Sequence, residues 1–228
     1  MIFRLGELFS GPGGLALGAK KAEIENNGEK FEIKHIWAND YHEDSCETYR
    51  RNIVPDFPER VICEDVKNLD ISSLPYIDAF AYGFPCNDFS IVGEQKGING
   101  EYGPLYLYGV DVLNVHNPKW FIAENVGGIS NANDGKTFKK ILNDLESAGN
   151  SGYKLVVNKY KFEEYGIPQN RHRIVIVGIR KDLGIEFKVP APTTVKKEDQ
   201  VTAYLFVHTP APVSHGVDHE FTNHPKQI

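Results

Sequence analysis

The sequence predicts an α/β fold built on a mostly parallel, doubly wound sheet. Short apolar segments rich in β-branched and aromatic residues alternate along the chain with segments that show helical periodicity. Several strand segments are apolar on both faces, which is typical of strands covered by helices on each side. Ligands in such sheets bind beyond the carboxyl ends of the strands, so functional residues are expected there.

The expected elements follow one another in the order that this fold requires. Strand patterns cover residues 2–8, 31–38, 61–63, 77–82, 120–123, 153–160 and 173–179. Helical patterns cover residues 14–26, 43–52, 105–116 and 137–148. Beyond residue 180 the chain is rich in Pro, Thr, Val and His and shows no sustained periodicity. We therefore expect a folded domain over residues 1–180 and an irregular tail over residues 181–228.

The composition is that of an ordinary folded protein. Of the 228 residues, 41% are hydrophobic and 25% charged, and no apolar run approaches the roughly 18 residues that cross a membrane. The N-terminus lacks the features of a signal peptide, so we expect a cytoplasmic protein with no membrane contact. The net charge of −6 argues against nucleic-acid binding through bulk charge. Any DNA binding must use a local basic cleft or another part of the protein.

A glycine-rich turn, FSGPGG at residues 9–14, follows the first expected strand. Glycines there let the backbone turn tightly and let a ligand approach the N-terminus of the next helix. The spacing of Gly11, Gly13 and Ala16 also satisfies the loose dinucleotide-binding fingerprint. A packing turn that binds no ligand is the alternative.

Two acidic residues lie at the ends of the next two expected strands. Asp40 follows the second strand, where a carboxylate can accept hydrogen bonds from ribose hydroxyls. Asp65 follows the third strand and could accept from an adenine amino group, although a helix cap is the more ordinary role for it. Together with the glycine turn, Asp40 favours a nucleoside cofactor over a turn that binds nothing.

The three cysteines are widely and unequally spaced, which fits neither a disulfide framework nor a CxxC metal pair. Cys86 follows the fourth expected strand in GFPCNDFS at residues 83–90, where open sheets place their reactive groups. Cys46, on a helical pattern, and Cys63, at the end of a short strand, lack that setting. We expect buried or inert thiols at both positions and no metal site.

Charged residues near the fifth and seventh expected strands complete the set of candidates. Glu124 follows an apolar strand, where a carboxylate is unfavourable unless it is solvated, paired or used in chemistry. Strand alternation predicts that Arg171 and Arg173 point to the same side, where two cations could bind a phosphate or a base oxygen. A solvated basic strand start is the alternative interpretation of the two arginines.

Four short motifs, in this order, resemble those of the DNA (cytosine-5)-methyltransferase family over about residues 1–180. They are FSGPGG, the Pro-Cys dipeptide in GFPCNDFS, ENV at residues 124–126 and QNRHR at residues 169–173. The resemblance implies the Rossmann-like fold of S-adenosylmethionine-dependent methyltransferases, with residues 1–180 as the catalytic domain. It also implies methylation of cytosine C5 in DNA, as in bacterial restriction–modification.

The resemblance further implies roles for individual residues. Cys86 would be the nucleophile that forms a covalent adduct with C6 of cytosine, and Glu124 would contact N3 of the base. Arg173 would lie near the base and Arg171 closer to the backbone. The S-adenosylmethionine site would be lined by Phe9, Gly11, Gly13, Gly14, Asp40, Tyr41, Asp65, Pro85 and Leu105.

Double-stranded DNA is the partner that this chemistry requires, because the target cytosine must be flipped out of the duplex to be reached. The sequence departs from the family pattern in two places. Asn87 follows Cys86 where many bacterial members have Gln, and the family's C-terminal half is not found. That half carries the target-recognition domain and the last two motifs. A second chain that supplies the recognition domain is therefore a further expected partner.

Three alternatives remain open. A tRNA cytosine-5 methyltransferase shares the same motifs, and an assay on tRNA would distinguish it. A nicotinamide-dependent oxidoreductase could use the glycine turn and Asp40, but it leaves Cys86 and Glu124 unexplained. The chain could also be a folded but inactive fragment or a split-enzyme subunit, which an assay with and without a C-terminal partner would reveal.

Overall fold

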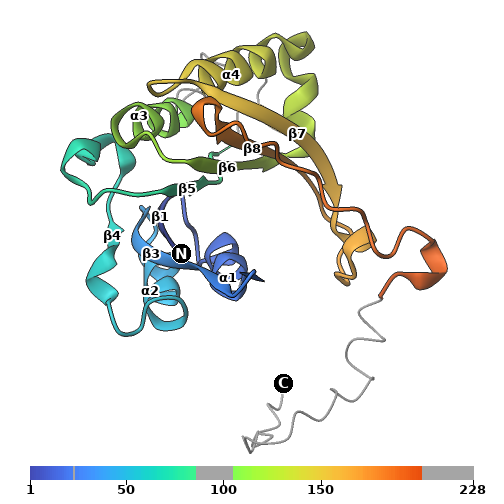
Figure 1. The fold of residues 1–228 in the computed structure, drawn as a ribbon, viewed down its shortest axis with the longest axis horizontal. Helices are drawn as coiled ribbons and strands as arrows, with labels where there is room; N and C mark the ends of the chain where they lie inside the picture. The colour runs from blue at the N-terminus through green and yellow to red at the C-terminus, as the bar shows by residue number, and fades with distance from the viewer. Residues whose placement is uncertain (23, 86–104, 202–228) are drawn as a thin grey trace, which may run out of the picture. The chain divides into compact units, whose positions relative to one another are not determined.

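The computed structural model describes residues 1–22, 24–85 and 105–201. The chain divides into two compact units, of which the first comprises Met1–Lys161 and His172–Ala191 and the second comprises Phe162–Arg171 and Pro192–Ile228. The first unit contains every strand of the sheet that the structure describes (Figure 1). No helix in the described part of the chain is both long and apolar enough to span a membrane.

The first unit is built around one eight-stranded sheet. The strands are β1 (Ile2–Leu8), β2 (Ile24–Asn26), β3 (Glu29–Asp40), β4 (Val61–Cys63), β5 (Ala79–Tyr82), β6 (Trp120–Val126), β7 (Tyr153–Lys161) and β8 (His172–Arg180). The α-helices are α1 (Gly14–Lys21), α2 (Glu43–Asn52), α3 (Tyr106–His116) and α4 (Lys136–Ser147).

The strands lie in the order β2-β3-β1-β5-β6-β8-β7, with β4 paired to β3. β1 pairs in parallel with β3 and β5, β3 with β4, and β5 with β6. β8 runs antiparallel to both β6 and β7. Helices α1 and α2 lie on one side of the sheet and α3 and α4 on the other (Figure 1). The predicted doubly wound, mostly parallel α/β fold is therefore confirmed.

Each helical layer packs against the sheet and forms a separate hydrophobic core with it. The larger core packs α3 and α4 against the sheet, and its fully buried members include Phe80, Val112, Leu113, Phe121, Ile141 and Leu145. The smaller core packs α1 and α2 against β3 and β4, through Ala16, Ala38, Cys46, Tyr49, Ile53, Val54 and Val61. Burial on both faces explains why the strand segments read as nearly continuous apolar runs.

One predicted element is wrong. The helix expected over residues 14–26 ends at Lys21, and Ile24–Asn26 forms β2, which pairs antiparallel with the start of β3. The two strands are joined by Asn27 and Gly28, which adopt φ angles of 52° and 78°. A two-residue Asn-Gly loop of this kind matches the twist of a β-hairpin and sets its register. The hairpin also explains why β3 begins earlier than predicted.

The second unit is small and irregular where the structure describes it. It contains two short 3-10 helices, Phe162–Tyr165 and Lys197–Asp199. The backbone N–H groups of Thr193 and Thr194 both donate to the carbonyl oxygen of Glu164 at 2.9 Å. The Thr194 hydroxyl oxygen accepts from the Gly166 N–H at 3.0 Å. The predicted division of the chain at residue 180 stays a prediction, and residues 202–228 of the predicted tail lie outside the described residues.

Candidate functional site

The glycine turn lies between β1 and α1, at the carboxyl edge of the parallel strands. Its backbone is unusual, because Phe9, Gly11 and Gly13 all have positive φ angles, of 52°, 53° and 97°. A positive φ at a phenylalanine is strained and is found mainly where surrounding structure or function requires it. A Cβ atom added at Gly11 or Gly14 would meet no atom within 4 Å. The turn therefore leaves its backbone open to a ligand.

Gly13 has the opposite role in the same turn. A Cβ atom at this position would lie 2.7 Å from Cγ1 of Ile53, at the end of α2. The absence of a side chain thus lets the N-terminus of α1 pack closely against the second helix.

Asp40, the last residue of β3, fastens the glycine turn to the edge of the sheet. Its Oδ2 accepts from the Gly11 N–H at 2.8 Å, and its Oδ1 accepts from the His42 N–H at 3.0 Å. The Ser10 N–H donates to the Asn39 carbonyl at 3.1 Å. These bonds hold the ends of β1 and β3 together, while the predicted cofactor site at these strand ends stays a prediction. A carboxylate has about four acceptor positions, so Asp40 can accept further bonds from a ligand.

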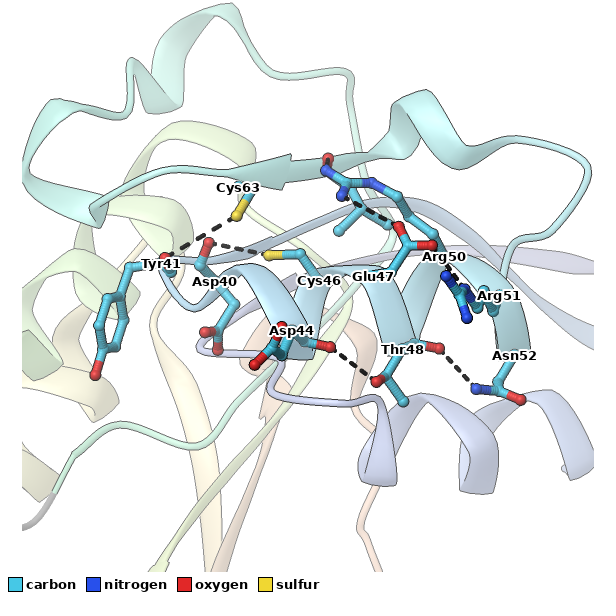
Figure 2. Close-up of polar contacts among 11 residues, drawn as sticks. Asp40, Tyr41, Asp44, Cys46, Glu47, Thr48, Arg50, Arg51, Asn52 and Cys63 are labelled. Carbon is cyan, nitrogen blue, oxygen red and sulfur yellow. Dashed lines mark hydrogen bonds and ion pairs between the residues drawn. The ribbon is translucent and has the colours of Figure 1, made fainter.

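Tyr41 and Asp65 are the exposed members of this edge. The Tyr41 side chain is 75% exposed and points away from α2 (Figure 2). Asp65 caps the 3-10 helix Val66–Asn68, because its side chain accepts from the Lys67 N–H at 3.0 Å. The cap that the sequence allowed for Asp65 is thus confirmed, while contacts of both residues with an adenosine group stay predictions.

The residues at this edge fit a small polar ligand. The hydroxyl oxygen of Ser10 is buried and has no hydrogen-bond partner among the described residues. A buried hydroxyl without a partner is unfavourable, and a ligand that binds in the turn could supply one. No three His, Cys, Asp or Glu side chains of the described residues lie close enough together to hold a metal ion.

A second part of the edge lies where β5 and β6 end. The chain leaves β5 through Gly83, Phe84 and Pro85, and the predicted nucleophile Cys86 lies outside the described residues. A Cβ atom at Gly83 would lie 3.3 Å from Oε2 of Glu124. The glycine therefore allows the turn that leads to Cys86 to pass close to this carboxylate. Pro85, predicted to line the cofactor site, is half-buried at the end of the turn.

Glu124 on β6 pairs with Arg173 on β8. Arg173 Nε lies 2.7 Å from Glu124 Oε1, and the two side chains are only 18% and 23% exposed. The Arg173 Nη1 also donates to the carbonyl oxygen of His172 at 2.8 Å. Of the three settings that the sequence allowed for this glutamate, the structure shows pairing, while its use in chemistry stays a prediction. Arg171 belongs to the second unit, where its N–H donates to the Gln169 carbonyl, and the predicted common side for the two arginines stays a prediction.

Two buried asparagines of this edge were not predicted. Asn125 is 3% exposed, and its Nδ2 donates to the Phe84 carbonyl at 3.0 Å. Asn39 is 1% exposed, and its Nδ2 donates to the carbonyls of Ile62 and Glu64 at 3.1 and 2.9 Å. Asn125 thus holds the backbone that follows β5, and Asn39 holds β4 and the residue that follows it. A polar residue inside an otherwise apolar strand is the signal that could have indicated them.

Leu105, predicted to line the cofactor site, is buried in the larger core. It is 8% exposed and precedes α3. Its predicted contact with a cofactor stays a prediction.

Comparison with known proteins adds family information to this geometry. The family model described as C-5 cytosine-specific DNA methylase matches residues 3–226. The Type II methyltransferase M.BbvI of Brevibacillus brevis is 58% identical over all of this chain and 62% of its own length. M.NgoFVII of Neisseria gonorrhoeae is 39% identical over 82% of this chain and 46% of its own length. The chain thus spans less than two thirds of the length of these curated relatives.

Solved structures share the fold at lower sequence identity. A DNA modification methyltransferase encoded within a prophage (E. coli) has a TM-score of 0.68 at 24% identity, over 92% of this chain and 56% of its own. The methyltransferase EhMeth of Entamoeba histolytica has a TM-score of 0.63 at 23% identity, over 85% of this chain and 57% of its own. These similarities agree with the Rossmann-like fold class that the sequence predicted.

Proposed function

Because the chain belongs to the C-5 cytosine-specific DNA methylase family, we propose that it forms the catalytic part of an enzyme that methylates C5 of cytosine in DNA. The observation that carries the proposal is the arrangement of the carboxyl edge. An open glycine turn held by Asp40 lies at the ends of β1 and β3, and the Glu124–Arg173 pair lies beside the turn that leads to Cys86. One part suits a nucleoside cofactor and the other a polar base.

S-adenosylmethionine is the proposed cofactor, and it would supply the methyl group. Asp40 would accept hydrogen bonds from the ribose hydroxyls while it holds Gly11, and Tyr41 and Asp65 would face the adenine. The open backbone at Gly11 and Gly14 and the buried hydroxyl of Ser10 support binding at the turn. The full proposed set is Phe9, Gly11, Gly13, Gly14, Asp40, Tyr41, Asp65, Pro85 and Leu105.

Cys86 is the proposed nucleophile. Cytosine C5 reacts poorly on its own, and addition of a thiolate at C6 makes C5 an enamine carbon that can attack a methyl group. A free thiol with a pKa of about 8.5 is only slightly ionised at neutral pH, so a nearby cation should help, and Arg173 is the candidate. After the transfer, removal of the C5 proton allows Cys86 to leave. We propose a water as the base for that step.

Glu124 would stabilise the charge that addition of the thiolate places on the ring, through a proton shared with N3. Arg173 holds one oxygen of this carboxylate, while the other lies beside Gly83. The pair would therefore present Glu124 in a fixed orientation. Arg171 would contact the DNA backbone.

The substrate is proposed as double-stranded DNA with one cytosine flipped out, which costs a few kcal/mol. The relatives are named Type II methyltransferases, which supports a specific DNA site of the restriction–modification kind. Recognition would come from the part of the relatives' length that this chain does not span, in the same polypeptide or in a second chain. This division of labour agrees with the net charge of −6.

Two binding and transfer measurements test the proposal. Calorimetry should show that S-adenosylhomocysteine binds, that Asp40→Ala weakens binding, and that NADH does not bind. Transfer of a labelled methyl group should occur to DNA but not to tRNA. It should require the region of the relatives that this chain does not span, supplied in the same polypeptide or as a second chain. Binding of NADH in place of S-adenosylhomocysteine would exclude methyl transfer. Methylation of tRNA alone would assign the chain to the RNA-modifying alternative.

A further inference from the structure

Two thiols outside the proposed catalytic machinery lie next to the cofactor edge. Cys46 is in the first turn of α2 and fully buried, whereas Cys63 ends β4 and is exposed, so of the buried or inert thiols that the sequence predicted only Cys46 is buried. Figure 2 shows both sulfur atoms pointing into the space between α2 and the ends of β3 and β4. The two sulfurs lie beside the carbonyl groups of the consecutive residues Asp40 and Tyr41.

The protein positions both sulfurs through adjacent carbonyl groups. Cys46 Sγ donates to the Asp40 carbonyl at 3.4 Å, and Cys63 Sγ donates to the Tyr41 carbonyl at 4.0 Å. The parallel register of β3 and β4 places Cys63 opposite Asp40. The thiol pair therefore contacts the main chain of Asp40 and Tyr41, the two residues whose side chains are proposed to bind the cofactor.

We propose that Cys46 and Cys63 are a peroxide-reactive thiol pair, which closes to an intramolecular disulfide and thereby weakens cofactor binding at the adjacent strand end. The chemical class of oxidant is hydrogen peroxide or an organic hydroperoxide. The effect on the cofactor rests on the proposed function, whereas formation of the disulfide does not.

The reaction balances as a two-electron oxidation. The exposed Cys63 sulfur attacks a peroxide oxygen and the O–O bond breaks as Cys63 becomes a sulfenic acid. The leaving oxygen departs as water from hydrogen peroxide, or as an alcohol from an organic hydroperoxide. The Cys46 sulfur then displaces the sulfenic oxygen as water, and the S–S bond forms. In total, the two thiols lose two protons and two electrons to the peroxide.

The burial of Cys46 and the exposure of Cys63 indicate which sulfur reacts first. Burial raises the pKa of the Cys46 thiol to about 12, with further contributions from the neighbouring Cys63 and Asp40 and a smaller opposing effect of Arg50. Cys46 thus stays protonated at neutral pH, and the oxidant meets Cys63 first. Closure of the disulfide should then accelerate as the pH rises above neutrality, because the Cys46 thiolate fraction rises.

Formation of the disulfide should change the hydrogen bonds that hold Asp40. The Asp40 carbonyl accepts from Cys46 Sγ and from the Glu64 N–H, and the disulfide removes the first of these donors. The bond also draws the first turn of α2 toward β4. Because the His42 N–H at the start of α2 donates to the Asp40 carboxylate, this carboxylate and the glycine turn that it holds should shift together.

The test uses the full chain with Cys86→Ser in every arm, so that Cys46 and Cys63 are the only thiols. After treatment with hydrogen peroxide, peptide mapping without reductant should find a peptide that links Cys46 to Cys63. The Kd for S-adenosylhomocysteine should rise about fivefold or more and return to its starting value after reduction. The added variant Cys63→Ser, which changes an exposed residue and leaves the core intact, should show neither effect.

The outcomes separate the two proposals. Cys63 oxidised to sulfinic acid with no linked peptide would overturn the thiol pair. A linked peptide with an unchanged Kd would overturn the coupling to the cofactor site. If the reduced protein does not bind S-adenosylhomocysteine at all, the proposed function fails, while the peptide map still decides whether the disulfide forms.

Discussion

Arg173 and Glu124 form an ion pair across β8 and β6, with Arg173 Nε 2.7 Å from Glu124 Oε1. The antiparallel register places Arg173 opposite Val126, two positions beyond Glu124 and on the same face of the sheet. Diagonal neighbours of this kind are within reach of long side chains. The contact therefore depends on the direction of β8, which runs antiparallel to β6, whereas β5 on the other side of β6 runs parallel to it.

If this pair orients Glu124 toward the base, Arg173→Gln should lower the rate of methyl transfer by about 100-fold or more. The affinity for S-adenosylhomocysteine should stay within about twofold, because the cofactor edge is not altered. Single-turnover transfer and calorimetry measure the two effects. Arg180→Gln is the matched control, since Arg180 pairs with Asp182 at 2.7 Å at the other end of the same strand. Equal losses in both variants would show that the effect is only structural.

Asn125 should position the turn that carries the nucleophile. Asn125→Asp preserves the size of the side chain but removes the N–H that donates to the buried Phe84 carbonyl. We expect a loss of about 1–3 kcal/mol in the free energy of unfolding, because the carbonyl is left without its partner. Well below the melting temperature, kcat should fall while the cofactor Kd is unchanged. A variant that is less stable but turns over normally would limit Asn125 to a structural role.

Asp78, at the edge opposite the site, should make stability depend on pH. Burial opposes ionisation, but hydrogen bonds from Arg4 and the charges of Arg4 and Lys119 outweigh it and hold the pKa of Asp78 below its usual range. A lowered folded-state pKa gives stability that is present above about pH 4 and is lost as the pH falls through the folded value. Urea unfolding of Asp78→Asn should therefore differ from the parent at pH 7 and converge with it toward pH 2.

The exposed Asp56 provides the control for that comparison. Asp56→Asn should follow the parent protein at every pH. A difference between Asp78→Asn and the parent that is as large at pH 2 as at pH 7 would contradict the assignment.

Gly109 in α3 should be intolerant of a methyl group. Alanine usually stabilises a helix interior by about 1 kcal/mol relative to glycine. Here a Cβ atom would lie 2.3 Å from the ring of the buried Tyr82, which leads into Gly83. Gly109→Ala should instead destabilise the protein by about 1–3 kcal/mol. In the matched variant Gly18→Ala on α1, the Cβ meets nothing within 4 Å, so chemical denaturation should show a gain.

The fold was largely predictable because its strands are buried on both faces and therefore stand out as apolar runs. Glu124 and Arg173 could each be selected from local patterns. Their pairing could not, because it depends on the antiparallel register of β6 and β8. Asn125 was missed for a similar reason, since its partner Phe84 is 41 residues away in the sequence. The β2–β3 hairpin was missed although Asn27-Gly28 signals its turn, because a helical pattern fits residues 14–26 up to that signal and hides the short strand before it.

Covalent trapping is the most direct test of the account. The assay uses the protein together with the region of the relatives that this chain does not span. DNA that contains 5-fluorocytosine at the target position should then form a stable covalent complex with it, because the fluorine cannot leave from C5. Denaturing electrophoresis would detect the complex, and it should depend on S-adenosylmethionine. Cys46→Ala and Cys63→Ala should retain trapping, whereas Cys86→Ala should abolish it. Trapping that persists without Cys86 would contradict the proposed mechanism.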